Sequence, residues 1–500
     1  MIFKGINLFK CSNLRFYSSN DNAVTQFLSD IFGLSFHEAK RFVEKFNLTG
    51  KNPETLRESI SFCKRFGFSD DDILSNPSLL TVQPLEVHNH YMALEETGLT
   101  KIFPRILAKA RTYMKKEIRF FKNADLLKVD ANVAKNFAQY LDIPPREELI
   151  NVVNDNKLWS EVHNLILRDY LKAKLGASEE DLIKLFRIHR VIRNKSFRMI
   201  RENIKIAEGL GFSPEKILKC GYLLHNYPEY PKKVLGDLNN IAGIDMKVAM
   251  RSYPKLVMVS PKNIIKVYGI LKEMNIPDEV IKRTPAIFQI SPETVKYRLE
   301  EIERIPDLRV LLGNPNILEL VVHHNKATSR LSFLQQVELK CASLMLLSSG
   351  TTEQFDNHIK QGTDAYSSKD VSNFLKSLFQ EDGESLLSAI RVHPFYLKVP
   401  FLQMQRTYDY LISRKFAPSS IRRVICLILY PKNRVEQAVG KLKNSTFMHV
   451  KGLNQVQRLN IVLYLIEKEY NFSGQGVWER DWDIQEGTKA TESVPEKILE

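Results

Sequence analysis

The sequence predicts an all-α protein, a superhelical solenoid of repeated helical units without a sheet. Three observations support this fold class. A short proline phrase recurs about every thirty residues, apolar residues between its copies follow helical spacing, and no segment alternates apolar and polar residues long enough for a sheet. A period of that size is typical of stacked helical units, each of which buries its apolar face only against a neighbour.

The proline phrase reads SNPSLLTVQP, SYPKLVMVSP and RTPAIFQISP in three of its copies. Each copy has a first proline, the slot residue, then hydrophobic residues and a second proline seven positions later. The pairs are Pro77/Pro84, Pro254/Pro261, Pro285/Pro292 and Gly221/Pro228, which has glycine in the slot. The slots at 221, 254, 285 and 315 are 33, 31 and 30 residues apart, so the period is regular.

Each copy of the phrase predicts a helix, a short turn and a second helix. Ser291 before Pro292 is an N-cap followed by proline at the first helical position, where its missing N–H is not needed. The slot proline ends the preceding helix because it cannot donate to the helical hydrogen bonds. Ten residues before the slot, Gly211 in Gly-Phe-Ser marks a corner between helices, and Asn275 takes its place in a degenerate copy.

This series of phrases with its upstream corner resembles the mitochondrial transcription termination factor family, mTERF, over about residues 60 to 470. The resemblance implies a left-handed superhelix of helical triplets with a positively charged concave groove for duplex DNA. Members of that family act in mitochondrial transcription termination or initiation, and some bind ribosomal RNA. Residues 100–180 and 340–385 fit the pattern poorly, and the polar run from Ser348 to Asp370 predicts a long loop.

The domain organisation follows from these patterns together with the two ends of the chain. We expect a mitochondrial transit peptide over 1–17, helical repeats over 18–340, an irregular polar linker over 341–385, helical repeats over 386–475 and an acidic tail over 476–500. No stretch reaches the roughly 18 apolar residues that a membrane span needs. The expected location is therefore the mitochondrial matrix.

Composition favours a polyanion as the partner and gives no support to catalysis. The formal net charge is +14, which favours nucleic acid or an anionic surface. The cysteines are few, far apart and without a C-x-x-C pair, so neither a disulfide framework nor a zinc site is indicated. Phosphate-binding glycine loops and the H-E-x-x-H motif are missing, and we expect no enzyme, cofactor or metal.

Basic residues in nearly acid-free clusters are the candidate nucleic-acid contacts. These are Arg190, Arg193, Arg198, Arg201, Lys205, Arg251, Lys282, Arg283, Arg422, Arg423 and Lys432. A further cluster runs from Arg105 to Lys122. The repeat phase places Asn194 at an N-cap, which leaves Arg198, Arg201 and Lys205 as one stripe on the next helix. Arg251 and Lys282 both stand three residues before a slot, so they are expected to line one surface.

Three partners remain open at this stage. Duplex mitochondrial DNA is favoured, and ribosomal RNA held by shape and phosphate contact is the alternative within nucleic-acid binding. A solenoid adaptor for a protein partner, such as another mTERF-family protein, is a third. A protein-binding groove favours aromatic anchors and mixed charge, whereas these clusters are almost entirely basic.

The acid-free leader generates a first prediction. Lys4, Lys10 and Arg15 precede the first acid, Asp21, with hydrophobic residues and serines between them. Import should therefore remove the leader close to Ser18. N-terminal sequencing of the protein from mitochondria measures the cut, and a mature protein that still begins at Met1 would contradict the prediction.

Overall fold

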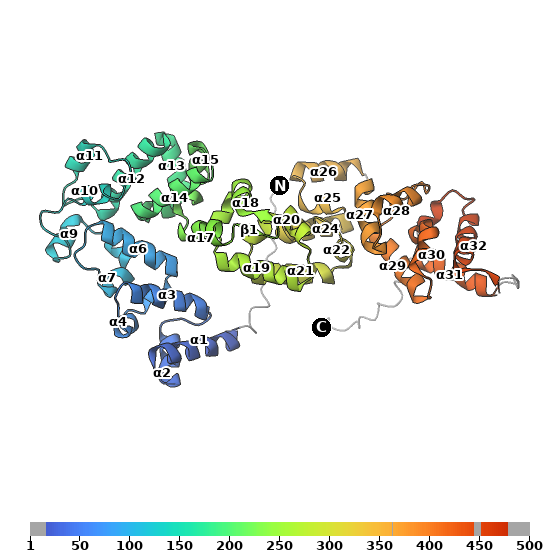
Figure 1. The fold of residues 1–500 in the computed structure, drawn as a ribbon, viewed down its shortest axis with the longest axis horizontal. Coiled ribbons are helices and arrows are strands. Elements are labelled where there is room, and N and C mark those ends of the chain that lie inside the picture. Colours follow the sequence, from blue (N-terminus) through green and yellow to red (C-terminus); the bar gives the residue numbers. More distant parts are fainter. Residues whose placement is uncertain (1–16, 363, 445–451, 479–500) are drawn as a thin grey trace, which may run out of the picture. The chain divides into compact units, whose positions relative to one another are not determined.

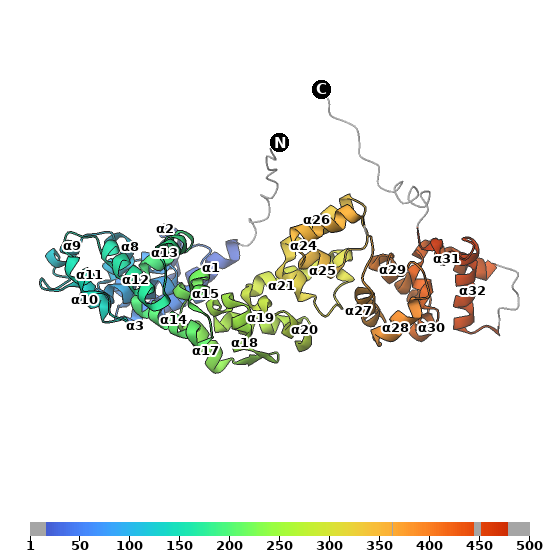
Figure 2. The same ribbon diagram turned by 90° about the horizontal axis from the view of Figure 1, so that it is seen from above.

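The computed structural model describes residues 17–362, 364–444 and 452–478 (Figures 1 and 2). The chain forms two compact units, one of residues up to 239 with 246–261, the other of residues 240–245 with those from 262 onward. Residues 1–16 of the expected leader and 479–500 of the expected tail lie outside the described residues. Within each unit, consecutive helices lie beside one another in chain order (Figure 1).

The first unit is helical throughout its described residues. Its elements are α1 (Tyr17–Phe32), α2 (Phe36–Lys45), α3 (Pro53–Arg65), α4 (Asp70–Ser75), α5 (Ser78–Thr81), α6 (Pro84–Glu96), α7 (Pro104–Ala108), α8 (Ala110–Tyr113), α9 (Ile118–Asn123), α10 (Val133–Ala138), α11 (Glu147–Val152), α12 (Trp159–Leu175), α13 (Glu179–Ile188), the 3₁₀ helix η1 (Arg190–Asn194), α14 (Phe197–Gly209), α15 (Pro214–Lys219), α16 (Tyr222–His225), α17 (Glu229–Asp237), α18 (Met246–Ser252) and η2 (Pro254–Met258).

The second unit begins with one small hairpin and is otherwise helical where described. Its elements are β1 (Asn240–Ile241), β2 (Ile244–Asp245), α19 (Pro261–Glu273), α20 (Asp278–Arg283), η3 (Pro285–Gln289), α21 (Pro292–Arg304), α22 (Pro306–Arg309), α23 (Leu318–Val322), α24 (His324–Gln336), α25 (Leu344–Ser348), α26 (Thr352–Gln361), α27 (Ser368–Phe379), α28 (Gly383–Ile390), α29 (Phe401–Ser413), α30 (Pro418–Arg423), η4 (Ile425–Leu429), α31 (Lys432–Asn444), α32 (Gln455–Lys468) and η6 (Gln475–Val477).

A triplet of helices recurs along both units and confirms the predicted repeat. A first helix of 13 residues, as in α3, α14, α19 and α29, is followed by a second helix of 6 residues, as in α4, α15, α20 and α30. A one-turn helix then closes the triplet: α5, α16, η2, η3 or η4. We call these one-turn helices, together with η1, the slot turns. Their slot residues are Pro77, Arg190, Gly221, Pro254, Pro285 and Ile425.

The corner between the first and second helices requires a left-handed residue. Gly67 and Gly211 both have φ +83°, which glycine adopts without a steric penalty. Asn275 (φ 58°) and Lys415 (φ 64°) occupy the same place in two other repeats. The lysine corner has no glycine or asparagine to mark it, which explains why that repeat is weakly patterned in the sequence.

One buried carboxylate organises the first unit. Glu96, the last residue of α6, is 0% exposed and caps the start of α14. Its oxygens accept from the Ser196 hydroxyl at 2.5 Å, the Phe197 amide at 2.8 Å and the Arg198 amide at 3.0 Å. Negative charge at a helix N-terminus is favourable because it satisfies free amides and the helix dipole. Burial raises the pKa of Glu96, while these donors and the Arg198 guanidinium oppose the rise.

Other buried polar groups tie further elements to the same junction. Asn89 of α6 accepts from the Ser196 amide at 3.0 Å and donates to the Asn194 carbonyl at 2.8 Å. His163 of α12 bonds the Lys195 carbonyl at 2.9 Å, and the Trp159 indole donates to Thr97 Oγ1 at 2.7 Å. The end of α6, the helix α12 and the start of α14 are thereby fixed to one another.

The helix break predicted near Asn194 is present, but the cap is shifted. The slot turn η1 ends at Asn194, and Ser196 caps α14 by accepting from the Met199 amide. The expected N-cap at Asn194 is therefore wrong by two residues. The slot residue Arg190 lies 31 residues before Gly221, two fewer than the 33 residues between Gly221 and Pro254, so the expected cap falls two residues too early.

The structure corrects two other expectations. The expectation that the chain has no sheet is wrong, because the described residues include a two-stranded hairpin in which Asn240 pairs with Asp245 and Ile241 with Ile244. The irregular linker over 341–385 and the loop over Ser348–Asp370 are also wrong, because α25, α26 and α27 lie there. Thr351 and Ser367 form capping boxes. Within the polar run, α26 buries only Phe355, so the run carries almost no apolar pattern that would predict a helix.

The described end of the chain folds back on the second unit rather than beginning a tail at 476. Gln403 Nε2 of α29 donates to the Val477 carbonyl at 3.1 Å, and the Arg434 guanidinium donates to the Trp478 carbonyl at 2.8 Å. Val477 is 0% exposed. Residues 476–478 therefore belong to the folded unit.

The Glu96 cap generates a prediction with a matched neighbour as control. Glu96→Ala leaves buried amides and the Arg198 guanidinium without their acceptor, which should lower the opening free energy of α14 by about 3–5 kcal/mol. Glu95→Ala removes a carboxylate that is 44% exposed and also paired with Arg198, and should cost at most about 1 kcal/mol. Hydrogen exchange of the α14 amides in the full chain measures both. Equal losses in the two variants would refute the role of Glu96.

Candidate nucleic-acid interface

Basic residues recur at the end of the second helix of most repeats, directly before the slot turn, with α4 as an exception. We call the third residue before the slot residue the minus-three position and the second residue before it the minus-two position. The minus-three residues include Arg187, Arg251, Lys282 and Arg422. The minus-two residues include Lys219, Arg283 and Arg423. Cations are favoured at a helix C-terminus by its dipole, which accounts for basic residues there without a ligand.

The minus-three residue Arg251 binds the corner of the preceding repeat. Its Nε donates to the carbonyl of Leu210, the last residue before the corner. Its guanidinium also covers Gly211, where an added Cβ would lie only 3.0 Å from the nearest guanidinium nitrogen. The corner carbonyl has lost its helical partner, so a cation from the next repeat satisfies it.

One minus-three residue of the second unit has a protein partner and another has none. Arg422 pairs with Glu381 at 2.7 Å, directly after the left-handed corner residue Gln380. Lys282 lies near the hairpin turn, where its Nζ would be 3.9 Å from a Cβ added to Gly243, and it forms no ion pair or hydrogen bond among the described residues. Arg251 and Arg422 therefore each connect one repeat to the corner before it.

The minus-two residues Lys219, Arg283 and Arg423 are exposed. Across the described part of the chain, none of the three has an ion-pair or hydrogen-bond partner. On α30 the two adjacent cations therefore differ, because Arg422 is paired with Glu381 and Arg423 extends into solvent. Arg283 and Arg423 were predicted from the sequence, whereas Lys219 was missed because no second basic residue stands beside it.

The predicted stripe on α14 divides in a similar way. Arg198 bonds the carboxylate of Glu95, and its Nε is 3.2 Å from Glu96. Arg201 donates to the Tyr140 carbonyl at 3.0 Å and lies 3.7 Å from Glu202. Only Lys205 of this stripe is exposed without an ion pair among the described residues. The two arginines are engaged within the first unit, so we leave them out of the proposed interface.

The remaining candidates lie on slot turns or directly after them. Arg190 and Arg193 are exposed on η1, and the Arg193 guanidinium lies 5.5 Å from the centre of the Phe186 ring. Lys432 begins α31 with its Nζ 6.0 Å from the centre of the Tyr410 ring. These cations are exposed and can meet an anion. We therefore add them to the minus-two residues as candidate contacts, each within its own unit.

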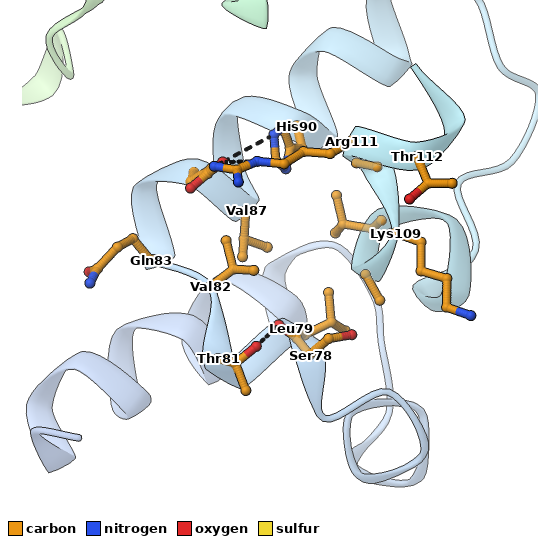
Figure 3. Close-up of a pocket in the computed structure, with 14 residues that line it drawn as sticks. Ser78, Leu79, Thr81, Val82, Gln83, Val87, His90, Lys109, Arg111 and Thr112 are labelled. Atoms are coloured by element: carbon orange, nitrogen blue, oxygen red, sulfur yellow. Dashed lines mark hydrogen bonds and ion pairs between the residues drawn. The ribbon is translucent and has the colours of Figure 1, made fainter. Parts of the chain in front are cut away.

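The basic cluster from Arg105 to Lys122 borders a cleft of about 410 Å³ between α5–α6 and α7–α8 (Figure 3). Lys109 and Thr112 line one side, and Ser78 and Thr81 line the other (Figure 3). Within the cleft, Glu86 pairs with the Arg111 guanidinium and lies 3.5 Å from His90 Nε2. Burial lowers the pKa of His90 to about 4, so the imidazole is neutral at pH 7.

Among the described residues, no three or more histidine, cysteine, aspartate or glutamate side chains are grouped so that they could hold a metal ion. In the same part of the chain, no helix combines the length and the apolar character that a membrane crossing requires.

Comparison with known proteins gives one match of great length. The chain is 28% identical over 463 residues to the protein named transcription termination factor 5, mitochondrial, of Drosophila melanogaster. The aligned region covers 90% of this chain and 82% of that protein. No family model matches the chain, and no solved structure matches it. The long alignment confirms the resemblance that the proline phrases carry, because the chain is similar over most of its length to a protein named as a mitochondrial transcription termination factor.

Proposed function

We propose that this protein binds duplex DNA in the mitochondrial matrix and regulates transcription there, with the minus-two residues as phosphate contacts. The observation that carries the proposal is that the cations of the minus-two position are exposed and have no protein partner in the described part of the chain, whereas Arg251 and Arg422 of the minus-three position are bonded to the protein. Lys219, Arg283 and Arg423 stand at one repeat position, exposed and without a protein partner among the described residues. Cations spaced by a structural repeat suit a polymer whose charges are also regularly spaced.

The similar protein supports the choice of partner and location. The name of that protein places it in mitochondria and assigns it to transcription termination, an event on a DNA template. The acid-free leader agrees with import. Phosphate contacts carry no base information, so the minus-two residues would position the protein on the duplex and leave sequence choice to other groups.

The test uses two variants that remove the same charge at adjacent positions. The minus-two variant is Lys219→Met, Arg283→Met and Arg423→Met; the minus-three variant is Arg251→Met, Lys282→Met and Arg422→Met. Log affinity for duplex DNA falls with log salt by about 0.9 per phosphate contacted, so losing three contacts should flatten the slope by about 2.7. The minus-two variant should show this change and keep its melting temperature.

The minus-three variant is the matched control. It should keep the slope and lose melting temperature, because Arg251 and Arg422 are bonded to neighbouring repeats. Fluorescence anisotropy on duplex DNA and an RNA hairpin, at several salt concentrations, measures the slopes. Equal flattening by both variants would show only a loss of total charge and defeat the proposal. Tighter binding to the hairpin would favour ribosomal RNA as the partner.

A further inference from the structure

A small cavity of about 130 Å³ lies within the first unit, between consecutive slot turns. Lys195, which follows η1, lines it together with His225, Asn226 and Tyr227, which follow or end α16, and Met258 at the end of η2. Cavities for drug-sized ligands measure roughly 300–1,000 Å³, so this one suits a much smaller group.

Two of these residues are of an unusual type for their position in the repeat. The first residue after a slot turn is Val82 for α5, Val259 for η2 and Ile290 for η3. In the two consecutive repeats that border the cavity, the same position holds Lys195 and Asn226. This position holds an aliphatic residue after α5, η2 and η3 and Tyr430 after η4, but a cation and an amide where the cavity opens.

Neither polar side chain has a protein partner to explain it. No hydrogen bond or ion pair of Lys195 Nζ or Asn226 Nδ2 is present among the described residues. Asn226 is only 4% exposed, and its Oδ1 is also unpartnered. Buried polar groups are nearly always bonded, so the buried Asn226 amide, beside a partly buried lysine that is also unpaired, favours an external partner in this cavity.

The surroundings favour a ligand with negative charge. Burial lowers the pKa of Lys195, and Glu86 is the acid whose charge opposes this effect. Glu86 is already paired with the Arg111 guanidinium. Burial and the Lys195 charge also lower the pKa of His225 to about 4, so His225 is neutral at pH 7 and adds no charge. An ammonium group that is shielded from water and is not paired with a carboxylate attracts an anion strongly.

We propose that this cavity binds a phosphate group, with the Lys195 ammonium as its counter-charge and the Asn226 amide as a hydrogen-bond donor. The group is either a phosphodiester of bound nucleic acid or a free phosphate. The first source rests on the proposed function, and the second does not.

The test is the effect of inorganic phosphate on the melting temperature of the full chain, against chloride at equal ionic strength. The variant is Lys195→Met, with Lys195→Arg to restore the charge and exposed Lys128→Met as control. In chloride, Lys195→Met should melt at or above the wild-type temperature, because a buried unpaired charge has been removed. Phosphate should raise the melting temperature of the wild type, Lys195→Arg and Lys128→Met more than that of Lys195→Met.

The outcomes separate this site from the proposed function. An equal phosphate response in Lys195→Met and the wild type would overturn the site, as would a lower melting temperature of Lys195→Met in chloride. If the site takes a phosphodiester, Lys195→Met also flattens the salt slope for duplex DNA by about 0.9. An unchanged slope with a lost phosphate response identifies free phosphate as the ligand. A wild type that binds no duplex but keeps the phosphate response removes the proposed function and supports the site.

Discussion

A single repeat of this chain cannot complete itself, and the rest of the structure depends on that constraint. The 13-residue first helix has an apolar face that only a neighbour covers, and the left-handed corner after it leaves carbonyls without helical partners. Arg251 supplies one such partner from the next repeat by donating to the Leu210 carbonyl. Glu96 solves the opposite problem at the start of α14, where amides need an acceptor.

This constraint decides which basic residues are available for a ligand. A cation that donates to a corner carbonyl or pairs with a buried carboxylate has a fixed position, and its charge is partly neutralised. Arg198, between Glu95 and Glu96, is an example. Arg423, one residue after Arg422 on the same short helix, has no such partner among the described residues. Both kinds contribute equally to the net charge of +14, so total charge overstates the surface that can meet a polyanion.

Periodicity made the fold predictable, and long-range pairing made the site only partly so. The proline phrase and the glycine corner act within a few residues, and the triplet architecture follows from them. The linker prediction failed because α26 forms within a polar run and buries a single apolar residue, Phe355. The stripe on α14 shows the second limit. Glu96 lies about one hundred residues before Arg198, and no spacing rule in the sequence connects them.

The central claim is that adjacent cations divide between holding repeats together and meeting nucleic acid. Lys219 and Lys282 test it most directly, because they are the same residue type at the minus-two and minus-three positions. Reactivity of each ammonium toward an acylating reagent, read by mass spectrometry with and without duplex DNA, compares them within one full-length protein. The account predicts that the duplex protects Lys219 and leaves Lys282 unchanged. Protection of Lys282 with an unaltered Lys219 would contradict it.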